Sequence, residues 1–184
     1  ACFHNERKLE VLWISSEKLE EKDKKTWETL KSADGIIVPG GFGIRGTEGK
    51  IMAARYAREN KVPYFGLCLG MQIMTIEFAR HVLKDNQITS EEFDEAGKTD
   101  RSKYIIHFLP DQSWQKEKGG TLRLGVYPCK LTAGTKTRAL YGKDSIEERH
   151  RHRYEFNNDF KKRLEDHGWV ASGTYTKENL VEIA

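Results

Sequence analysis

The chain has 184 residues, and its 31 Lys and Arg against 28 Asp and Glu give a formal net charge of +3. This length suits one domain, and 38% hydrophobic residues exclude a globally disordered chain. The near-balanced charge predicts a protein that does not bind nucleic acid, and the absence of a membrane-length apolar run predicts one that does not bind a membrane. The three cysteines form no CxxC pair, so we expect reduced thiols and a cytoplasmic protein.

Strand and helix patterns alternate through the first half of the sequence. In chain order they are a strand at 9–14, a helix at 23–33, a strand at 36–38, a helix at 47–60, a strand at 62–66 and a helix at 71–83. Such alternation is typical of βαβ units. The predicted fold class is therefore α/β, with a central, mostly parallel sheet flanked by helices.

The second half is more polar and less regular. Its patterns predict a long loop at 84–103, a strand at 104–109, a polar excursion at 110–120, a strand at 121–126, a helix at 156–167 and strands at 169–172 and 180–183. The period-two alternation at 121–126 is that of a half-exposed strand. We therefore expect a smaller antiparallel part at the periphery of the fold.

Two glycine-rich patterns look like nucleotide-binding motifs but lack required residues. Gly41–Gly46 fits GxGxxG, yet the next strand ends without the carboxylate that a dinucleotide site needs. Gly49-Lys50 looks like the end of a P-loop, but Ile44 stands where the first glycine belongs and Ile51 stands where Ser or Thr belongs. Neither pattern predicts a phosphate-binding loop.

A cysteine between two glycines is the strongest chemical signal. Gly66-Leu67-Cys68-Leu69-Gly70 lies between a predicted strand and a predicted helix and matches GxSxG with Cys in place of Ser, the pattern of a nucleophile elbow. The turn would place the Cys68 thiol at a helix N-terminus, where the dipole favours thiolate, and aim the Leu69 N–H at an oxyanion. Gly40-Gly41 would expose further N–H groups. A buried structural cysteine in a glycine-rich turn is the alternative.

Three segments occur in this order along the chain: VPGGFG at 38–43, RGTEGK at 45–50 and GLCLGMQ at 66–72. In these segments and their order, the chain resembles the class I glutamine amidotransferase family. RGTEGK, together with SEEF at 90–93 and ERHRHRYE at 148–155, is similar to the glutaminase domains of the CTP synthase family. The resemblance covers most of the chain. It implies one glutamine amidotransferase domain over 1–184, with a flavodoxin-like α/β fold.

The resemblance implies a role for each matching residue. Cys68 would attack the side-chain amide of L-glutamine, and the N–H groups of Gly41 and Leu69 would hold the oxyanion. The implied glutamine-binding residues are Gly41, Gln72, Glu92, Arg153 and Tyr154. The charges agree with this role, because Glu92 can pair with the ammonium of an amino acid and Arg153 with its carboxylate.

The resemblance also implies an effector and a lid near the site. Phe42, Arg45, Gly46 and Glu48 match the family segment that lies near the GTP effector and the lid. For Arg45 and Glu48, a solvated loop is the alternative. No cofactor or metal is implied in this domain, since ATP and Mg belong to a separate synthetase domain.

The sequence departs from the family at the general base. The family carries this base in a His-Pro-Glu segment, which does not occur here, and none of the six histidines is a good substitute. We therefore expect the chain to be short of the family's domain at both ends, without its first strand and its His-Glu pair. We also expect it to be inactive on its own.

The predicted function is glutamine hydrolysis through a cysteine thioester. The resemblance implies that the ammonia is used for ATP-dependent amination of UTP to CTP, a ligase reaction of pyrimidine biosynthesis, in the synthetase domain of a homo-oligomeric protein. Two alternatives stay open. One is another class I amidotransferase or a γ-glutamyl hydrolase, and the other is a non-catalytic binding or interface module.

Overall fold

The computed structural model describes residues 5–108 and 123–184. The elements of the first half are α1 (Ser16–Glu20), α2 (Lys24–Lys31), β1 (Ile36–Val38), α3 (Thr47–Asn60), β2 (Tyr64–Gly66) and α4 (Leu69–Leu83). β1 and β2 are parallel, with Ile36 opposite Tyr64 and Val38 opposite Gly66. A helix follows each of these parallel strands, so the predicted α/β class is confirmed.

The second half contains most of the strands. Its elements are β3 (Thr89–Ser90), η2 (Glu91–Phe93), η3 (Arg101–Lys103), β4 (Tyr104–Phe108), β5 (Arg123–Leu131), α5 (Lys136–Tyr141), β6 (Ser145–His152), β7 (Tyr154–Phe156), η4 (Asn158–Phe160), α6 (Lys161–Glu165), β8 (Gly173–Tyr175) and β9 (Leu180–Ile183). The strands of the described residues form three sheets, β1-β2, β3-β4-β7 and β6-β5-β8-β9. β3 and β4 are parallel, whereas all pairings in the last sheet are antiparallel. The antiparallel part is thus larger than the sequence suggests.

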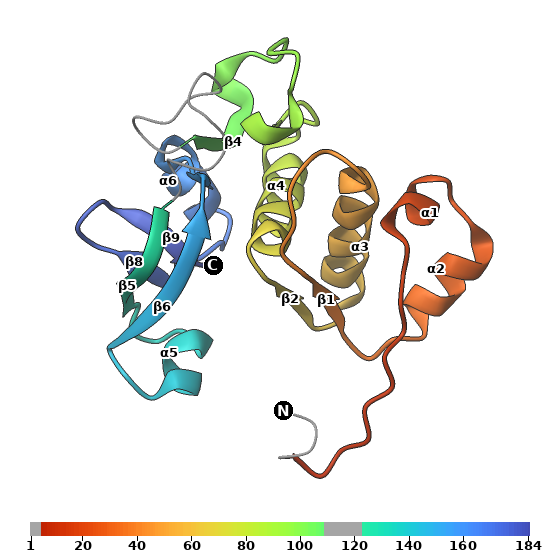
Figure 1. Cartoon of the computed structure of the whole chain (residues 1–184), viewed down its shortest axis with the longest axis horizontal. Helices are drawn as coiled ribbons and strands as arrows, with labels where there is room; N and C mark the ends of the chain where they lie inside the picture. Colours follow the sequence, from red (N-terminus) through yellow and green to blue (C-terminus); the bar gives the residue numbers. More distant parts are fainter. Residues whose placement is uncertain (1–4, 109–122) are drawn as a thin grey trace.

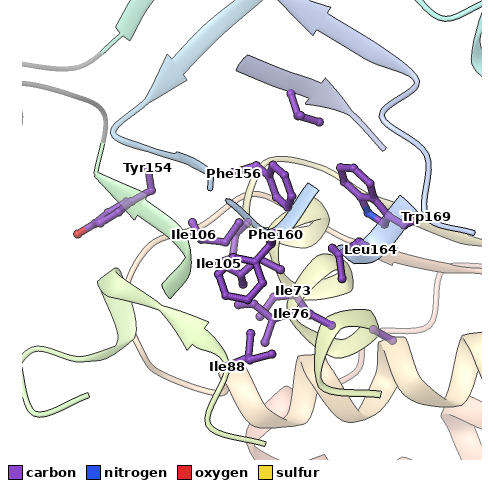
Figure 2. Close-up of a cluster of buried hydrophobic side chains, with 14 of the residues drawn as sticks. Ile73, Ile76, Ile88, Ile105, Ile106, Tyr154, Phe156, Phe160, Leu164 and Trp169 are labelled. Carbon is purple, nitrogen blue, oxygen red and sulfur yellow. The ribbon is translucent and has the colours of Figure 1, made fainter. Parts of the chain in front are cut away.

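Helix α4 lies at the centre of the molecule, between α3 and the sheets of the second half, with α1 and α2 beyond α3 (Figure 1). Ile73 and Ile76 of its buried face belong to one apolar cluster with side chains from the second half of the chain, among them Ile105, Ile106, Phe156, Phe160, Leu164 and Trp169 (Figure 2). Full burial of a large apolar side chain stabilises by about 1.5–3 kcal/mol. This cluster therefore fixes the start of α4 relative to β7, and the candidate site lies between these two elements.

The predicted helices at 23–33, 47–60 and 71–83 are confirmed as α2, α3 and α4. Asp23 caps α2, since its Oδ1 accepts the Thr26 N–H at 2.8 Å. The start of α3 is marked instead by Gly46, whose φ of 65° lies in the left-handed region that favours glycine. No helix within residues 5–108 and 123–184 is both long enough and apolar enough to cross a membrane.

Two predicted strands are wrong. The segment at 9–14 has no regular structure, and Leu9, Val11 and Trp13 are exposed. An apolar run forms a strand only beside a pairing partner, and none of the described strands pairs with it. The strand predicted at 169–172 lies instead at 173–175, where pairing with β5 and β9 decides its place.

Other predictions for the second half hold with smaller changes. The strands at 104–109 and 180–183 are confirmed as β4 and β9, and the helix at 156–167 is shortened to η4 and α6. The loop predicted at 84–103 includes the short elements β3, η2 and η3. The polar excursion at 110–120 and the first two residues of the strand predicted at 121–126 lie outside the described residues.

Candidate active site

Cys68 lies in a tight turn between β2 and α4. It is the N-cap residue of α4 and adopts φ 53° and ψ −107°, a conformation that is uncommon for a residue with a side chain. The turn is closed by hydrogen bonds from the Leu67 N–H to Val38 O and from the Gly70 N–H to Leu67 O, both 2.9 Å. Strained backbone of this kind clusters at functional sites. Residues 66–70 therefore have the backbone shape of a nucleophile elbow.

Both glycines of the elbow are required by close backbone packing. A Cβ on Gly66 would lie 2.6 Å from the Met71 nitrogen, and a Cβ on Gly70 would overlap the Val38 carbonyl oxygen. Real Cβ atoms do not approach backbone atoms this closely. The two glycines thus allow α4 to begin directly against β1 and β2.

The half-buried Cys68 thiol lies among two backbone donors and two carboxyl groups. Burial is the largest influence and raises the pKa of the thiol. Hydrogen bonds from the N–H groups of Leu69 and Gly41 lower this pKa, while the negative charges of Glu92 and Glu155 raise it. The net shift is upward because burial outweighs the two N–H donors, so the thiol form is favoured.

The glycine pair after β1 passes directly over the elbow. A Cβ on Gly40 would lie 3.4 Å from Cys68 Cβ, and a Cβ on Gly41 would lie 3.3 Å from Leu69 Cδ2. The N–H groups of Gly41 and Leu69 both act as hydrogen-bond donors to the Cys68 sulfur. A carbonyl carbon attacked by this sulfur would have its oxygen within reach of both donors.

Glu92 is a buried acid beside the cysteine, only 7% exposed. The Gly43 N–H donates a 2.8 Å hydrogen bond to Glu92 Oε1, and the Glu92 N–H donates a 3.2 Å hydrogen bond to Ser90 Oγ. Burial raises the pKa of the Glu92 carboxyl, whereas the Gly43 N–H and the charge of Arg153 lower it. A carboxylate held in this way is suited to pair with a cationic ligand group.

Arg153 and Tyr154 approach Glu92 from the junction of β6 and β7. Arg153 lowers the pKa of Glu92, and the charge of Glu92 in turn contributes to the raised pKa of Tyr154, whose largest cause is burial. The Tyr154 ring packs against Phe108 at 4.6 Å between centroids, with its hydroxyl directed away from the labelled isoleucines (Figure 2). The Cys68 thiol is thus influenced by Gly41, Leu69 and Glu92, and Glu92 in turn interacts electrostatically with Arg153 and Tyr154.

Gln72 lies in the first turn of α4, next to the elbow. It is buried, with 8% of its surface exposed, and its N–H donates to Cys68 O at 3.2 Å. The backbone thus places Gln72 one helical turn beyond the thiol.

The residues matched to the effector and lid segment form contacts with helices. The Arg45 guanidinium donates to both carboxylate oxygens of Glu17 in α1, at 2.5 and 2.9 Å. Glu48 lies in the first turn of α3 and not in a loop, and its exposed carboxylate accepts from Arg80 of α4 at 2.9 Å. Phe42 is 66% exposed, and at Gly46 a Cβ would overlap Ser16 Oγ.

A buried charged cluster beside the site was missed in the sequence. Arg123 Nη1 lies 3.3 Å from Glu155 Oε1, and Arg123 Nη2 lies 2.6 Å from Glu182 Oε1, although the latter two atoms lack hydrogen-bond alignment. His150 Nε2 lies 3.0 Å from Glu182 Oε2, and the Nδ1 atoms of His150 and His152 are 3.2 Å apart. Strand periodicity was the available signal, because it places these two histidines on one face of β6.

The charges of this cluster are unequal. Burial, with a further contribution from Glu182, raises the pKa of Glu155 to about 7. Burial also lowers the pKa of His152 to about 4, so that imidazole is neutral at pH 7. One guanidinium thus faces two carboxyl groups, one of which retains a proton near neutrality. Across the described ranges, no group of three or more His, Cys, Asp or Glu side chains could hold a metal ion.

Comparison with known proteins agrees with this site. The family described as "Glutamine amidotransferase class-I" matches residues 1–184. The chain therefore belongs to the class I glutamine amidotransferase family. The elbow cysteine and its two N–H donors lie within the matched region.

Its relatives are CTP synthases. The chain is 52% identical over 183 residues to the CTP synthase of Carboxydothermus hydrogenoformans and 50% identical over 184 residues to that of Shouchella clausii. Each match covers 100% of this chain and 33% of the relative, so the chain spans about a third of the length of these curated relatives.

A solved structure, the glutaminase domain of Trypanosoma brucei CTPS with bound acivicin, is similar in fold. The TM-score is 0.83 at 33% identity, over 94% of this chain and 64% of that chain. The predicted amidotransferase-like α/β fold is thereby confirmed.

Proposed function

We propose that this chain is the glutamine-hydrolysing domain of a CTP synthase. The observation that carries the proposal is the convergence of the Gly41 and Leu69 N–H groups on the Cys68 thiol, beside the buried carboxyl of Glu92. The similarity to CTP synthases over the whole chain supports it. The similar fold of the Trypanosoma brucei CTPS glutaminase domain, which was solved with bound acivicin, also supports it.

The proposed reaction is acyl transfer from nitrogen to sulfur and then to water. The Cys68 sulfur attacks the side-chain carbonyl carbon of glutamine, and the oxygen becomes an oxyanion held by the two N–H groups. The C–N bond then breaks, and the nitrogen leaves as ammonia after it gains a proton. Water hydrolyses the resulting thioester to glutamate and restores the thiol.

Recognition of glutamine is assigned to the groups around the elbow. The Glu92 carboxylate would accept the substrate ammonium, and Arg153 would pair with the substrate carboxylate. Tyr154, Gln72 and Gly41 would complete the binding site. The ammonium would offset the charge of Glu92, which raises the pKa of Cys68, so binding itself would favour the thiolate.

A general base must take the thiol proton. Among the described residues, the groups that act on the pKa of Cys68 are two backbone N–H groups and two carboxyl groups, with no imidazole. The 184 residues also contain no His-Pro-Glu segment. We therefore expect this chain alone to release ammonia from glutamine no faster than its own Cys68→Ala variant.

The remaining assignments follow from the CTP synthase relationship. The ammonia would pass to a synthetase domain that aminates UTP with ATP and Mg, in a cytoplasmic homo-oligomer, and the glutaminase domain would need no cofactor of its own. GTP would act as effector near Phe42, Arg45, Gly46 and Glu48. For Arg45 and Glu48, such binding would compete with their contacts to Glu17 and Arg80.

The test is Cys68→Ala in the full-length protein. CTP formation from glutamine should disappear, while CTP formation from added ammonia should continue, because only the supply of ammonia is removed. Cys129→Ala is the matched control: this cysteine is fully buried among Leu131 and Ile146, and its removal should leave both activities in place. Loss of both activities in Cys68→Ala would contradict the proposal.

The upward shift in the pKa of Cys68 favours a second candidate, a non-catalytic binding module. A diazo-ketone analogue of glutamine separates the two. Covalent labelling of Cys68 that glutamine prevents supports the glutaminase, and an unlabelled Cys68 in the full-length protein supports the binding module.

A further inference from the structure

One buried guanidinium connects the strand next to the candidate site with two strands of another sheet. Arg123, the first residue of β5, is 6% exposed, and it lies between Glu155 of β7 and Glu182 of β9. The rings of Tyr127 and Tyr175 flank it, with their centroids 4.2 and 4.8 Å from Arg123 Cζ. These contacts leave a planar guanidinium little freedom to reorient.

Arg123 also holds the chain through its backbone. In the β5–β6 ladder its register partner is His152, which is the last residue of β6. Arg123 thus contacts His152 through the backbone pairing of the strands and Glu155 through its own side chain. Only Arg153 and Tyr154 lie between these two points. The chain passes there from the four-stranded sheet into the three-stranded sheet.

Both residues interact electrostatically with Glu92. Arg153 lies just before β7 and Tyr154 begins it, and the ladder of this strand constrains them weakly. β7 has three residues, lies at the edge of its sheet and pairs with β4 alone among the described strands. A strand this short has few ladder hydrogen bonds to fix its position. The contact between Arg123 and Glu155 provides a second constraint at the residue that follows Tyr154.

We propose that Arg123 is a positioning residue for glutamine binding: by holding His152 and Glu155, it fixes Arg153 and Tyr154 opposite Glu92. The inference rests on the proposed function, because it assumes that these residues hold the amino acid. It requires an arginine, since a guanidinium reaches two carboxyl groups from two separate nitrogens, whereas a lysine offers one.

Arg123→Lys tests the inference, because it keeps the positive charge but removes the pair of nitrogens that reach Glu155 and Glu182. The full-length protein is treated with a diazo-ketone analogue of glutamine, and alkylation at Cys68 is followed by mass spectrometry. The half-saturating concentration reports binding, and the maximal rate reports attack by the sulfur. We expect the half-saturating concentration to rise about tenfold or more, the effect of weakened charge-assisted hydrogen bonds. The maximal rate should stay within about twofold.

The matched control is Arg58→Lys. Arg58 forms a comparable fork with Glu77 between α3 and α4, at 2.9 Å from Nε and 2.8 Å from Nη2. Both variants should lower the melting temperature, but only Arg123→Lys should raise the half-saturating concentration. A purely structural role for Arg123 predicts that neither variant changes it.

The outcomes separate the inference from the proposed function. If wild-type Cys68 is labelled and protected by glutamine, an unchanged half-saturating concentration in Arg123→Lys overturns the positioning role alone. If wild-type Cys68 is not labelled, both the positioning role of Arg123 and the proposed function are contradicted. Glu155→Gln serves if Arg123→Lys does not fold, because it removes the carboxyl group through which Arg123 holds the residue that follows Tyr154. In that variant we expect a rise of about threefold or more, and no rise contradicts the inference.

Discussion

Gly43 and Glu92, which are 49 residues apart in the sequence, are joined by a 2.8 Å hydrogen bond from the Gly43 N–H to Glu92 Oε1. This bond connects the loop over the elbow to the buried acid that raises the pKa of the thiol. The position and charge of Glu92 are therefore linked to the reactivity of Cys68.

Glu92→Gln should lower the pKa of Cys68, because it removes a negative charge that disfavours the thiolate. The pH dependence of alkylation by iodoacetamide, followed at Cys68 by mass spectrometry, should shift to lower pH. Glutamine use should weaken in the same variant, since the ammonium loses its partner. Glu91→Gln is the control, because Glu91 Oε2 instead accepts the Phe108 N–H. A pKa of Cys68 that is unchanged or higher in Glu92→Gln would contradict this assignment.

Gly70→Ala should destabilise the protein by about 2 kcal/mol or more, because the new Cβ would overlap the Val38 carbonyl oxygen. Urea unfolding measures the loss. Gly35→Ala is the matched control: its Cβ would meet Pro63 O at an ordinary 3.6 Å, so stability should change by less than about 1 kcal/mol. If Gly70→Ala lost no more unfolding free energy than Gly35→Ala, the elbow would tolerate a side chain at residue 70.

Glu155 should make stability depend on pH. Its pKa is about 7 in the folded protein, against an ordinary value of 4.5, so the folded state retains a proton that the unfolded state releases. The resulting stabilisation is complete below about pH 4.5 and is lost as the pH rises through about 7. Glu155→Gln should therefore flatten the decline in unfolding free energy between pH 5 and pH 8 (about 3 kcal/mol at most). Glu147 is exposed, so Glu147→Gln should retain the wild-type decline in unfolding free energy with pH. If the wild type, Glu155→Gln and Glu147→Gln showed the same pH dependence, the raised pKa of Glu155 would be refuted.

Arg58→Met should cost about 3 kcal/mol of stability, because it leaves the buried Glu77 carboxylate without the guanidinium that joins α3 to α4. Thermal unfolding measures this loss. Arg55→Met breaks an exposed pair with Glu59 on the same helix and should produce no measurable change. A similar melting temperature for the two variants would mean that the Arg58–Glu77 pair adds nothing to helix packing.

Local signals explain what could be predicted from the sequence. The elbow was predictable because Gly66, Cys68 and Gly70 are close neighbours, and their spacing alone defines a sharp turn. α2, α3 and α4 were predictable because apolar residues at helical spacing mark a helix locally, and α2 is also capped by Asp23. The resemblance to a family then linked Glu92 and Arg153 to the thiol, although they are distant in sequence.

Tertiary pairing explains what could not be predicted. The segment at 9–14 has the composition of a strand but no described neighbour to pair with, so its composition misleads. The cluster of Arg123, Glu155 and Glu182 joins three strands whose register is set only when the sheets assemble. The rise in the pKa of Cys68 was missed for the same reason, since burial is a property of the assembled site and the helix dipole can be read locally.

The protonated resting state of Cys68 has a consequence for reagent design. A thiol of raised pKa reacts slowly with general electrophiles at neutral pH, since only its small thiolate fraction attacks. A reagent that carries an ammonium group would neutralise the adjacent acid as it binds, and so increase the reactivity of the sulfur it is meant to modify. Selectivity for this cysteine over other cellular thiols would then depend on the cationic end of the molecule more than on the strength of its reactive group.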